Sequence, residues 1–406
     1  MLRSAEVMHL VKEKAELFGV QGIDPDEVTF DLSKAVARKD QIVQGIIDGI
    51  YQGLKSNKNI SFITGRAEFS SPIDIKIDGK SLTSKNTILA VGSRPYLPDI
   101  PGLEEAGYIT NDEALNLREL PDSMIIIGGG YIGVEFAQMY NRFGTKVTLL
   151  GRAKRLMKNE EPELSENLAD LLFQEGITVH TSAEVLRAGK DKNDSFVEAR
   201  VDGEEIKFIA SKILLATGRI AHVDNLGIAQ AGIDMEGSFI KADDQLLTTA
   251  PNIWSLGDAN GGLLFTHRAT YDGPIAALNS VKGEEKKVDY RIVPRAIFSE
   301  PALASVGLTE SKAKESGYDV KTGIAYFKNS GRAKAIGQRN GLAKIIVDNK
   351  TNKILGGHIL GPRADDLIHE VVVAMQGHGS LETLTKSIHI HPTLSEVVKN
   401  AAKAAR

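Results

Sequence analysis

A histidine and a glutamate near the end of the chain have the spacing of an acid–base pair. They are His391 and Glu396, in the run HIHPTLSEVV. A carboxylate that accepts a hydrogen bond from an imidazole fixes its tautomer, so that the ring can shuttle a proton at neutral pH. We therefore interpret the two residues as a catalytic pair. Two alternatives stay open: Thr393 to Glu396 also fits a T-x-x-E capping box, and His391 could be an ordinary loop residue before a proline.

A glycine-rich turn in the middle of the chain has the pattern of a dinucleotide-binding loop. The run GGGYIG fits G-x-G-x-x-G with Gly128, Gly130 and Gly133, after an apolar strand-like run and before a helix-like segment. The first glycine permits a tight turn, the second lets the backbone approach a pyrophosphate, and the third lets helix and strand pack closely. A purely structural glycine turn is the alternative.

The residue that follows the next strand bears on the choice of nucleotide. About 20 positions after the glycines, an acidic residue is expected for a ribose 2′-hydroxyl. Here the strand KVTLL ends at Gly151 and Arg152. Because an arginine can bind a 2′-phosphate with two hydrogen bonds, the pattern slightly favours NADPH over NADH. A solvated basic loop is the other interpretation.

Composition bounds the class of protein. A chain of 406 residues is too long for one core, and roughly two to four domains are expected. A net charge of −4 gives no reason to expect nucleic acid or an anionic membrane as partner. No apolar run is long enough for a membrane span. The absence of cysteine excludes disulfides and thiolate metal sites within these residues, so we expect no metal site and a cytoplasmic protein.

The order of elements indicates an α/β fold. Helical periodicity covers 1–18 and about 33–56, and period-two alternation predicts a strand over 60–69. From Pro121 the chain alternates strand, glycine loop, helix and strand, which is typical of a parallel sheet. The runs ILAVGSRP and LLATGRIA share one pattern, an apolar strand that ends in a turn of small residues. We expect two Rossmann-like domains, the first incomplete at its N-terminus, and a C-terminal α+β domain.

Four motifs in register resemble one family. The runs IIIGGGYIGVEFA, LLATGR, NIWSLGDANGG and HIHPTLSE occur in the order found in the FAD-dependent pyridine nucleotide–disulfide oxidoreductases. The resemblance covers essentially the whole chain and is greatest to dihydrolipoamide dehydrogenase, with mercuric reductase and glutathione reductase as relatives. It implies electron transfer between NAD(P)H and a small-molecule or protein disulfide through FAD. It also implies a homodimer, in which the His391–Glu396 pair reaches the partner subunit's active site.

The resemblance assigns cofactor contacts position by position. The nicotinamide nucleotide would lie on the glycine turn and near Glu135 and Gly218, and FAD would contact Gly65, Asp258 and the run LFTH. Asp258 could instead cap the next helix. The full set of expected cofactor-binding residues is Gly128, Gly129, Gly130, Tyr131, Ile132, Gly133, Glu135, Arg152, Gly218, Gly65, Asp258, Leu264, Phe265, Thr266 and His267.

The resemblance also predicts a domain division. We expect a first part of the FAD domain at 1–119, an NAD(P) domain at 120–240, a second FAD part at 241–290 and a dimerisation domain at 291–406. In the family, a first glycine loop and a C-x-x-x-x-C pair precede the segment equivalent to LRSAEVMHL, and we expect this chain to begin after them. It would then be inactive in disulfide chemistry as given. The alternative is a cysteine-free, nucleotide-binding, dimerising protein or a simple NAD(P)H diaphorase.

Overall fold

The chain divides into two compact units, each assembled from segments that are distant in sequence. The computed structural model describes residues 1–377 and 379–406. The first unit consists of Met1–Asp40, Leu97–Thr217 and Arg291–Arg406, and the second of Gln41–Tyr96 and Gly218–Tyr290. The long helix α2 (Leu32–Ser56) contributes residues to both.

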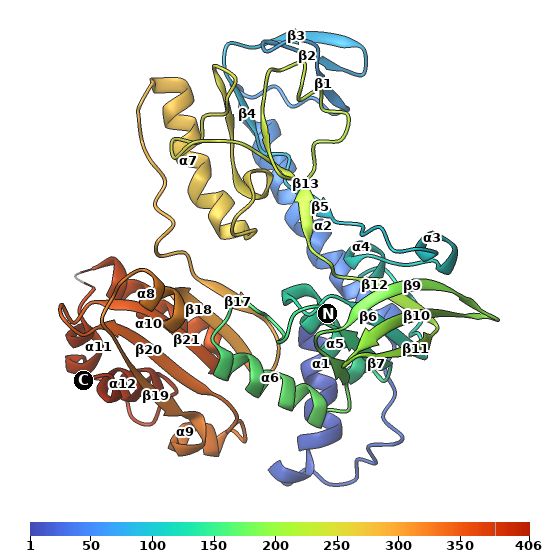
Figure 1. Cartoon of the computed structure of the whole chain (residues 1–406), viewed down its shortest axis with the longest axis vertical. Coiled ribbons are helices and arrows are strands. Elements are labelled where there is room, and N and C mark those ends of the chain that lie inside the picture. Colours follow the sequence, from blue (N-terminus) through green and yellow to red (C-terminus); the bar gives the residue numbers. More distant parts are fainter. Residues whose placement is uncertain (378) are drawn as a thin grey trace. The chain divides into compact units, whose positions relative to one another are not determined.

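A four-stranded parallel sheet organises the first half of the first unit (Figure 1). Its strand order is β12–β6–β7–β8, and helices α5 and α6 make the two crossovers. This is the strand, glycine turn, helix and strand order predicted from sequence, and the α/β fold class is confirmed. The elements are β6 (Ser123–Ile127), α5 (Tyr131–Phe143), β7 (Lys146–Leu150), α6 (Pro162–Gln174), β8 (Thr178–His180) and β12 (Lys212–Leu215).

Both faces of this parallel sheet are covered, which explains the unbroken apolar run of β6. Alternate residues of a strand point to opposite faces. Met124 and Ile126 pack in the core that contains α1 and α5, whereas Ile125 and Ile127 pack against an antiparallel sheet, β11–β10–β9. Parallel strands buried on both sides need such continuous hydrophobic sequences. The covering elements are α1 (Leu2–His9), α3 (Leu103–Ala106), α4 (Asn111–Ala114), β9 (Glu184–Asp191), β10 (Asp194–Val201) and β11 (Glu204–Ala210). After α1 the chain continues in a π-helix (Leu10–Lys14) and a 3₁₀ turn (Glu16–Phe18), which contribute no buried residue.

A five-stranded antiparallel sheet forms the C-terminal half of the first unit. Its order is β17–β18–β21–β20–β19; α10 packs against β18 and β21, and α12 packs against β19 and β20. The elements are β17 (Arg295–Ile297), β18 (Ala302–Gly307), α8 (Glu310–Glu315), β19 (Val320–Tyr326), a 3₁₀ turn (Phe327–Asn329), α9 (Gly331–Ala335), β20 (Leu342–Asp348), β21 (Ile354–Gly361), α10 (Ala364–Gln376), α11 (Leu381–Lys386) and α12 (Ser395–Ala404).

The second unit contains short strands around helix α7. The two runs ILAVGSRP and NIWSLGD supply β4 and β16, which pair in parallel in one sheet. The predicted strand over 60–69 is wrong for 60–66: among residues 1–377 and 379–406 no strand pairs with that segment, and Ile60, Phe62 and Ile63 are exposed. The elements are β1 (Ala67–Phe69), β2 (Asp74–Ile77), β3 (Lys80–Thr83), β4 (Thr87–Leu89), β5 (Ser93–Pro95), β13 (Arg219–Ala221), β14 (Met235–Glu236), β15 (Phe239–Ile240), β16 (Ile253–Ser255), a 3₁₀ turn (Gly257–Asn260) and α7 (Thr266–Lys282).

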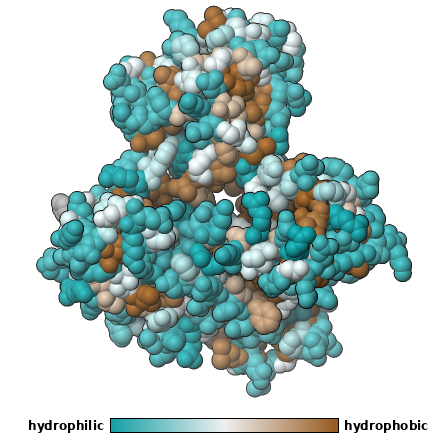
Figure 2. Space-filling view, in the orientation of Figure 1, coloured by the Kyte–Doolittle hydropathy of each residue, from teal (hydrophilic) through white to brown (hydrophobic). Residues whose placement is uncertain are grey.

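The surface carries scattered apolar groups. Figure 2 shows a mainly hydrophilic face on which hydrophobic residues form separate patches. Across residues 1–377 and 379–406, no helix has the length and apolar character needed to cross a bilayer.

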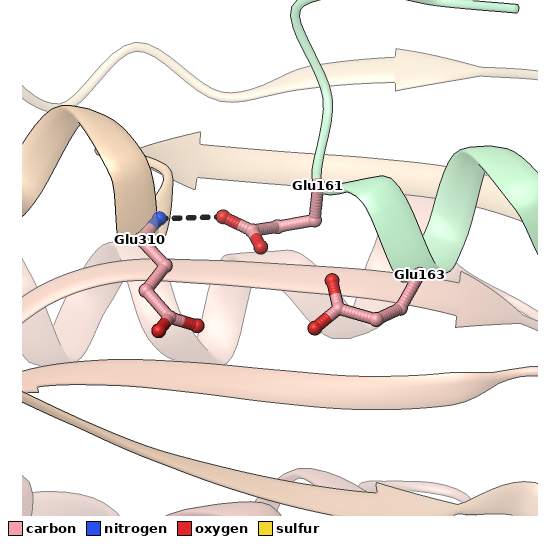
Figure 3. A group of neighbouring side chains, drawn as sticks. All are labelled: Glu161, Glu163 and Glu310. Carbon is pink, nitrogen blue, oxygen red and sulfur yellow. Dashed lines mark hydrogen bonds between the residues drawn. The ribbon is translucent and has the colours of Figure 1, made fainter. Parts of the chain in front are cut away.

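A buried lysine joins the two halves of the first unit. Lys344, on β20, is 1% exposed, and its Nζ lies 2.7 Å from Glu161, 2.8 Å from Glu163 and 2.8 Å from Glu310. Figure 3 shows how these carboxylates converge from the start of α6 and the start of α8, with the Glu310 backbone N–H donating to Glu161. The carboxylate oxygens lie close enough together to suit a metal ion, but the lysine ammonium fills the place of the cation.

Charge and hydrogen bonding in this cluster make its stability depend on pH. Hydrogen bonds from Lys314 and Lys344 lower the pKa of Glu310. A carboxylate whose pKa is lowered by folding stabilises the fold above its unfolded pKa. The contribution is lost as the pH falls through the lowered pKa.

We expect Lys344→Met to destabilise the protein by about 3–5 kcal/mol, because it leaves buried carboxylates without their cation. Urea unfolding followed by circular dichroism would measure the change. Lys314→Met is the matched control, since Lys314 pairs with the same Glu310 but its side chain is 59% exposed, and we expect a loss of about 0–1 kcal/mol. Equal losses in the two variants would contradict this assignment.

Candidate functional site

The glycine turn is built so that only glycine fits at two positions. A Cβ on Gly128, where φ is +130°, would lie 2.1 Å from the Ala216 carbonyl oxygen, and a Cβ on Gly133 would lie 1.8 Å from the Gly128 carbonyl oxygen. Gly130, the N-cap of α5, has open space at its Cβ position. The turn therefore combines tight helix–strand packing with an accessible helix N-terminus. Such an N-terminus presents backbone N–H groups that can bind phosphate oxygens.

The end of β7 lies against this turn. The Gly128 N–H donates to the Leu150 carbonyl oxygen at 2.8 Å, and a Cβ on Gly129 would meet the Gly151 Cα at 3.2 Å. The exposed Arg152 follows directly. The structure thus brings together the glycines and the arginine that sequence analysis singled out for the nicotinamide nucleotide.

Three other predicted residues of α5 have different surroundings. The Tyr131 hydroxyl donates to Glu160 at 2.7 Å, and burial together with the Glu160 charge raises the Tyr131 pKa. Glu135 accepts a hydrogen bond from the Phe298 N–H at 2.9 Å, and burial raises its pKa. Ile132 packs against the hydrophobic core. Tyr131 and Glu135 therefore link the glycine helix to the C-terminal half of the unit.

The residues expected to contact FAD lie in the second unit. Asp258 accepts a hydrogen bond from the Ser93 hydroxyl at 2.6 Å, and Arg219 donates to both the Ser93 hydroxyl and carbonyl oxygens at 2.7 Å. Ser93 thereby ties ILAVGSRP, LLATGR and NIWSLGD together. Sequence analysis missed Ser93 and Arg219 as individual residues, although both stand in the repeated strand-end runs that it had recognised.

The other residues expected to contact FAD also lie in that unit, and so does Gly218, which was expected near the nicotinamide nucleotide. Leu264 and Phe265 precede α7, Phe265 is its N-cap, and Thr266 and His267 open the helix. The Gly218 carbonyl oxygen accepts from the Tyr96 N–H at 2.9 Å. A Cβ on Gly65 would lie 2.5 Å from Asp78, beside the β2–β3 turn. Gly128–Gly133 belong to the first unit, whereas Gly65, Gly218, Asp258 and 264–267 belong to the second.

His391 and Glu396 lie within hydrogen-bond distance of each other in the structure. His391 Nδ1 lies 3.1 Å and 3.2 Å from the two Glu396 carboxylate oxygens, so Nδ1 carries the hydrogen. Glu396 also accepts from the Thr393 N–H at 3.1 Å, and this bond and His391 lower its pKa. Half of the alternative capping box is therefore present, but the Thr393 hydroxyl donates to the Ile390 carbonyl oxygen instead of capping α12.

The pair opens on a cavity of about 380 Å³ between β19 and α12. The His391 side chain is 81% exposed. Besides the pair, the cavity is lined by Ile324, Ala325, Tyr326, Asn329, Ser330, Gly331, Val397 and Asn400. A histidine whose Nδ1 is held by a carboxylate and whose Nε2 faces an accessible space can exchange a proton with a bound molecule.

Known proteins share this architecture along nearly the whole chain. Dihydrolipoyl dehydrogenase of Chlorobaculum tepidum is 38% identical over 99% of this chain and 86% of its own length. Mercuric reductase of Staphylococcus aureus is 33% identical over 99% of this chain and 73% of its own length. In structure, the HOCl-induced flavoprotein disulfide reductase RclA from Escherichia coli aligns with a TM-score of 0.86 at 31% identity, covering 93% of this chain and 87% of that one.

Two family models match the chain and agree with the similarity to these relatives. Residues 5–273 match the family described as pyridine nucleotide-disulphide oxidoreductase, and residues 293–402 match its dimerisation domain. The first match spans the glycine turn and both strand-end repeats, and the second spans the five-stranded sheet and the His391–Glu396 pair. With the parallel sheet and the glycine turn described above, these matches establish that the chain belongs to the pyridine nucleotide-disulphide oxidoreductases, a family of FAD-dependent enzymes that use pyridine nucleotides.

Proposed function

We propose that this chain binds NAD(P)H at the glycine turn and FAD in the second unit, and that His391 with Glu396 serves as the acid–base of a disulfide oxidoreductase. The observation that carries the proposal is the geometry of the pair, with both Glu396 oxygens at hydrogen-bond distance from Nδ1 and the ring exposed to a cavity. If Glu396 served only to cap α12, it would not need to accept a hydrogen bond from a histidine.

The residues around each cofactor position suit the group proposed for it. At the glycine turn, the absence of Cβ atoms at Gly128 and Gly133 permits the tight turn and the close helix–strand packing, and the open side of Gly130 leaves the backbone accessible to a pyrophosphate. Asp258, fixed by Ser93, would hold a hydroxyl-bearing chain of FAD, and 264–267 stand at the N-terminus of α7. Bound NAD(P)H supplies a hydride, and FAD passes the electrons on.

The His391–Glu396 pair would manage the proton of a thiol. Glu396 keeps the hydrogen on Nδ1, so Nε2 is the atom that faces the cavity and exchanges the proton. During disulfide reduction Nε2–H would protonate the leaving thiolate, and in the reverse direction Nε2 would take the proton back. Glu396 acts through His391 and stabilises the charged ring without contacting the reacting sulfur.

The chain contains no cysteine, which favours a second candidate function for these 406 residues alone. Without a thiol supplied from outside them, they cannot exchange with a disulfide. We propose that on their own they are inactive in disulfide chemistry and act at most as a diaphorase that passes electrons from NAD(P)H to small acceptors.

We also propose a homodimer. The match of 293–402 to a dimerisation domain supports it, and Ile388 and Ile390, next to His391, are 98% and 80% exposed. Two large apolar side chains in such a position are suited to burial against a partner subunit. The division at 119, 240 and 290 and a cytoplasmic location remain predictions.

NADPH specificity can be tested at Arg152. If its guanidinium binds a 2′-phosphate, calorimetry should show tighter binding of NADPH than of NADH, and Arg152→Glu should erase or reverse the preference. We expect a change of about tenfold or more, the size of a charge-assisted hydrogen bond. Lys154→Glu, at an exposed position two residues on, is the control and should keep the preference. An unchanged ratio in Arg152→Glu would refute the assignment.

The role of His391 can be tested by supplying the thiols. A chain in which a segment with a G-x-G-x-x-G loop and a C-x-x-x-x-C pair precedes Met1 should reduce disulfides. In that chain His391→Gln should lower disulfide turnover by about 2–4 orders of magnitude while leaving flavin reduction by NAD(P)H nearly intact. Glu396→Gln should cost less, because it removes orientation and keeps the proton carrier.

The 406-residue chain is the control for this experiment. It should show no turnover with lipoamide or glutathione disulfide, since it has no thiol. Unchanged disulfide turnover in His391→Gln would make the pair structural, and any turnover by the cysteine-free chain would contradict the proposed chemistry.

A further inference from the structure

A second histidine, two residues before His391, is largely buried, whereas His391 is exposed. In the segment that leads to His391, the exposed Ile388 and Ile390 flank His389, whose side chain is only 8% exposed. This out–in–out alternation is that of an extended chain. The two isoleucines contribute little burial in this chain, so His389 is the side chain through which residues 388–390 are attached to the protein.

Both ring nitrogens of His389 face acceptors. Nδ1 lies 3.1 Å from the Ser387 carbonyl oxygen, and Nε2 contacts a carboxylate oxygen of Glu370 on α10. Both nitrogens are therefore at hydrogen-bond distance from an oxygen acceptor, and the acceptor of Nε2 is a carboxylate. Hydrogen bonds in which one partner is ionised are about twice as strong as neutral ones.

The acceptor, Glu370, is on a rigid element. Its helix neighbours Ile368 and Val371 are 1% and 0% exposed and belong to the core that α10 forms with the five-stranded sheet. A Cβ on Gly357 of β21 would lie 2.7 Å from Val371, so α10 approaches the sheet very closely at this level. The carboxylate that binds His389 is thus fixed by packed core residues.

We propose that His389 and Glu370 are positioning residues, which fix the segment that precedes His391. Glu396, which follows His391 in the chain, fixes the imidazole ring itself. This inference rests on the proposed acid–base role of His391. Lys399, which donates to the Ser387 carbonyl oxygen at 2.5 Å, ties the start of the same segment to α12. His391 is therefore held from α10 through His389 and from α12 through Glu396.

Histidine side-chain nitrogen spectra and backbone relaxation measurements on the 406-residue chain would test this proposal. In Glu370→Leu we expect the backbone order parameters of 389–391 to fall from about 0.85 to about 0.6 or below, because the segment loses its attachment to α10, and the Nδ1–H signal of His391 to broaden or disappear. Glu370→Gln keeps an oxygen acceptor and should restore most of both properties. His389→Asn should resemble Glu370→Leu, and it provides an independent variant if the leucine disturbs α10.

His369→Gln is the matched control, since His369 is exposed on the same helix next to Glu370. It should leave both measurements at the wild-type level. If Glu370→Leu and His389→Asn also match the wild type, the positioning role is overturned. If Glu396→Gln leaves the His391 Nδ1–H signal of the wild-type chain unchanged, the acid–base pair fails, and the order parameters of 389–391 still decide whether Glu370 holds the segment.

Discussion

Two adjacent buried carboxylates, Glu160 and Glu161, hold the halves of the first unit together. Glu160 accepts hydrogen bonds from Arg295, Ser305 and Tyr131, and Glu161 accepts from Lys344 and from the Glu310 backbone. Burial acts to raise the pKa of Glu160, but the Arg295 charge and the hydrogen bonds outweigh it and lower the pKa. Because burying an ion is costly, such a pair persists only where every partner is in place. The relative position of parallel and antiparallel sheets depends on these contacts.

This framework connects the glycine turn with the segment that carries His391 and Glu396. Tyr131, the first residue of α5, is bonded to Glu160, which is bonded to β17 and β18 of the C-terminal sheet. The same sheet carries α10 and α12 on its packed face. The glycine turn and the His391 segment are therefore both held in place by the same core strands. The proposed chemistry of the two sites is nevertheless separate. Within each site, local contacts fix the positions of the functional groups. At the turn these contacts are the close approaches that only glycine permits, and in the His391 segment they are the two histidine–glutamate pairs.

The sequence predicted local motifs better than the contacts between segments that are distant in the chain. The β6–α5–β7 order followed from apolar runs and glycine spacing, and the family of the chain from four motifs. The His391–Glu396 bond was expected, because the run HIHPTLSE resembles the histidine–glutamate motif of the family. Ser93, Glu160 and Glu370 could not be singled out, because their partners lie far along the chain and their roles arise only on folding. The strand prediction was wrong for residues 60–66 for a related reason: alternating polar and apolar residues do not show whether another strand is available for pairing.

The central claim is that the Gly128–Gly133 turn binds a pyridine nucleotide, and amide chemical-shift mapping of the chain during titration with NADPH tests it most directly. Saturable shifts confined to residues 128–133, the following turn of α5 and Arg152 are the predicted result. An absence of saturable shifts, or shifts that are centred elsewhere in the chain and leave the glycine turn unchanged, would contradict it.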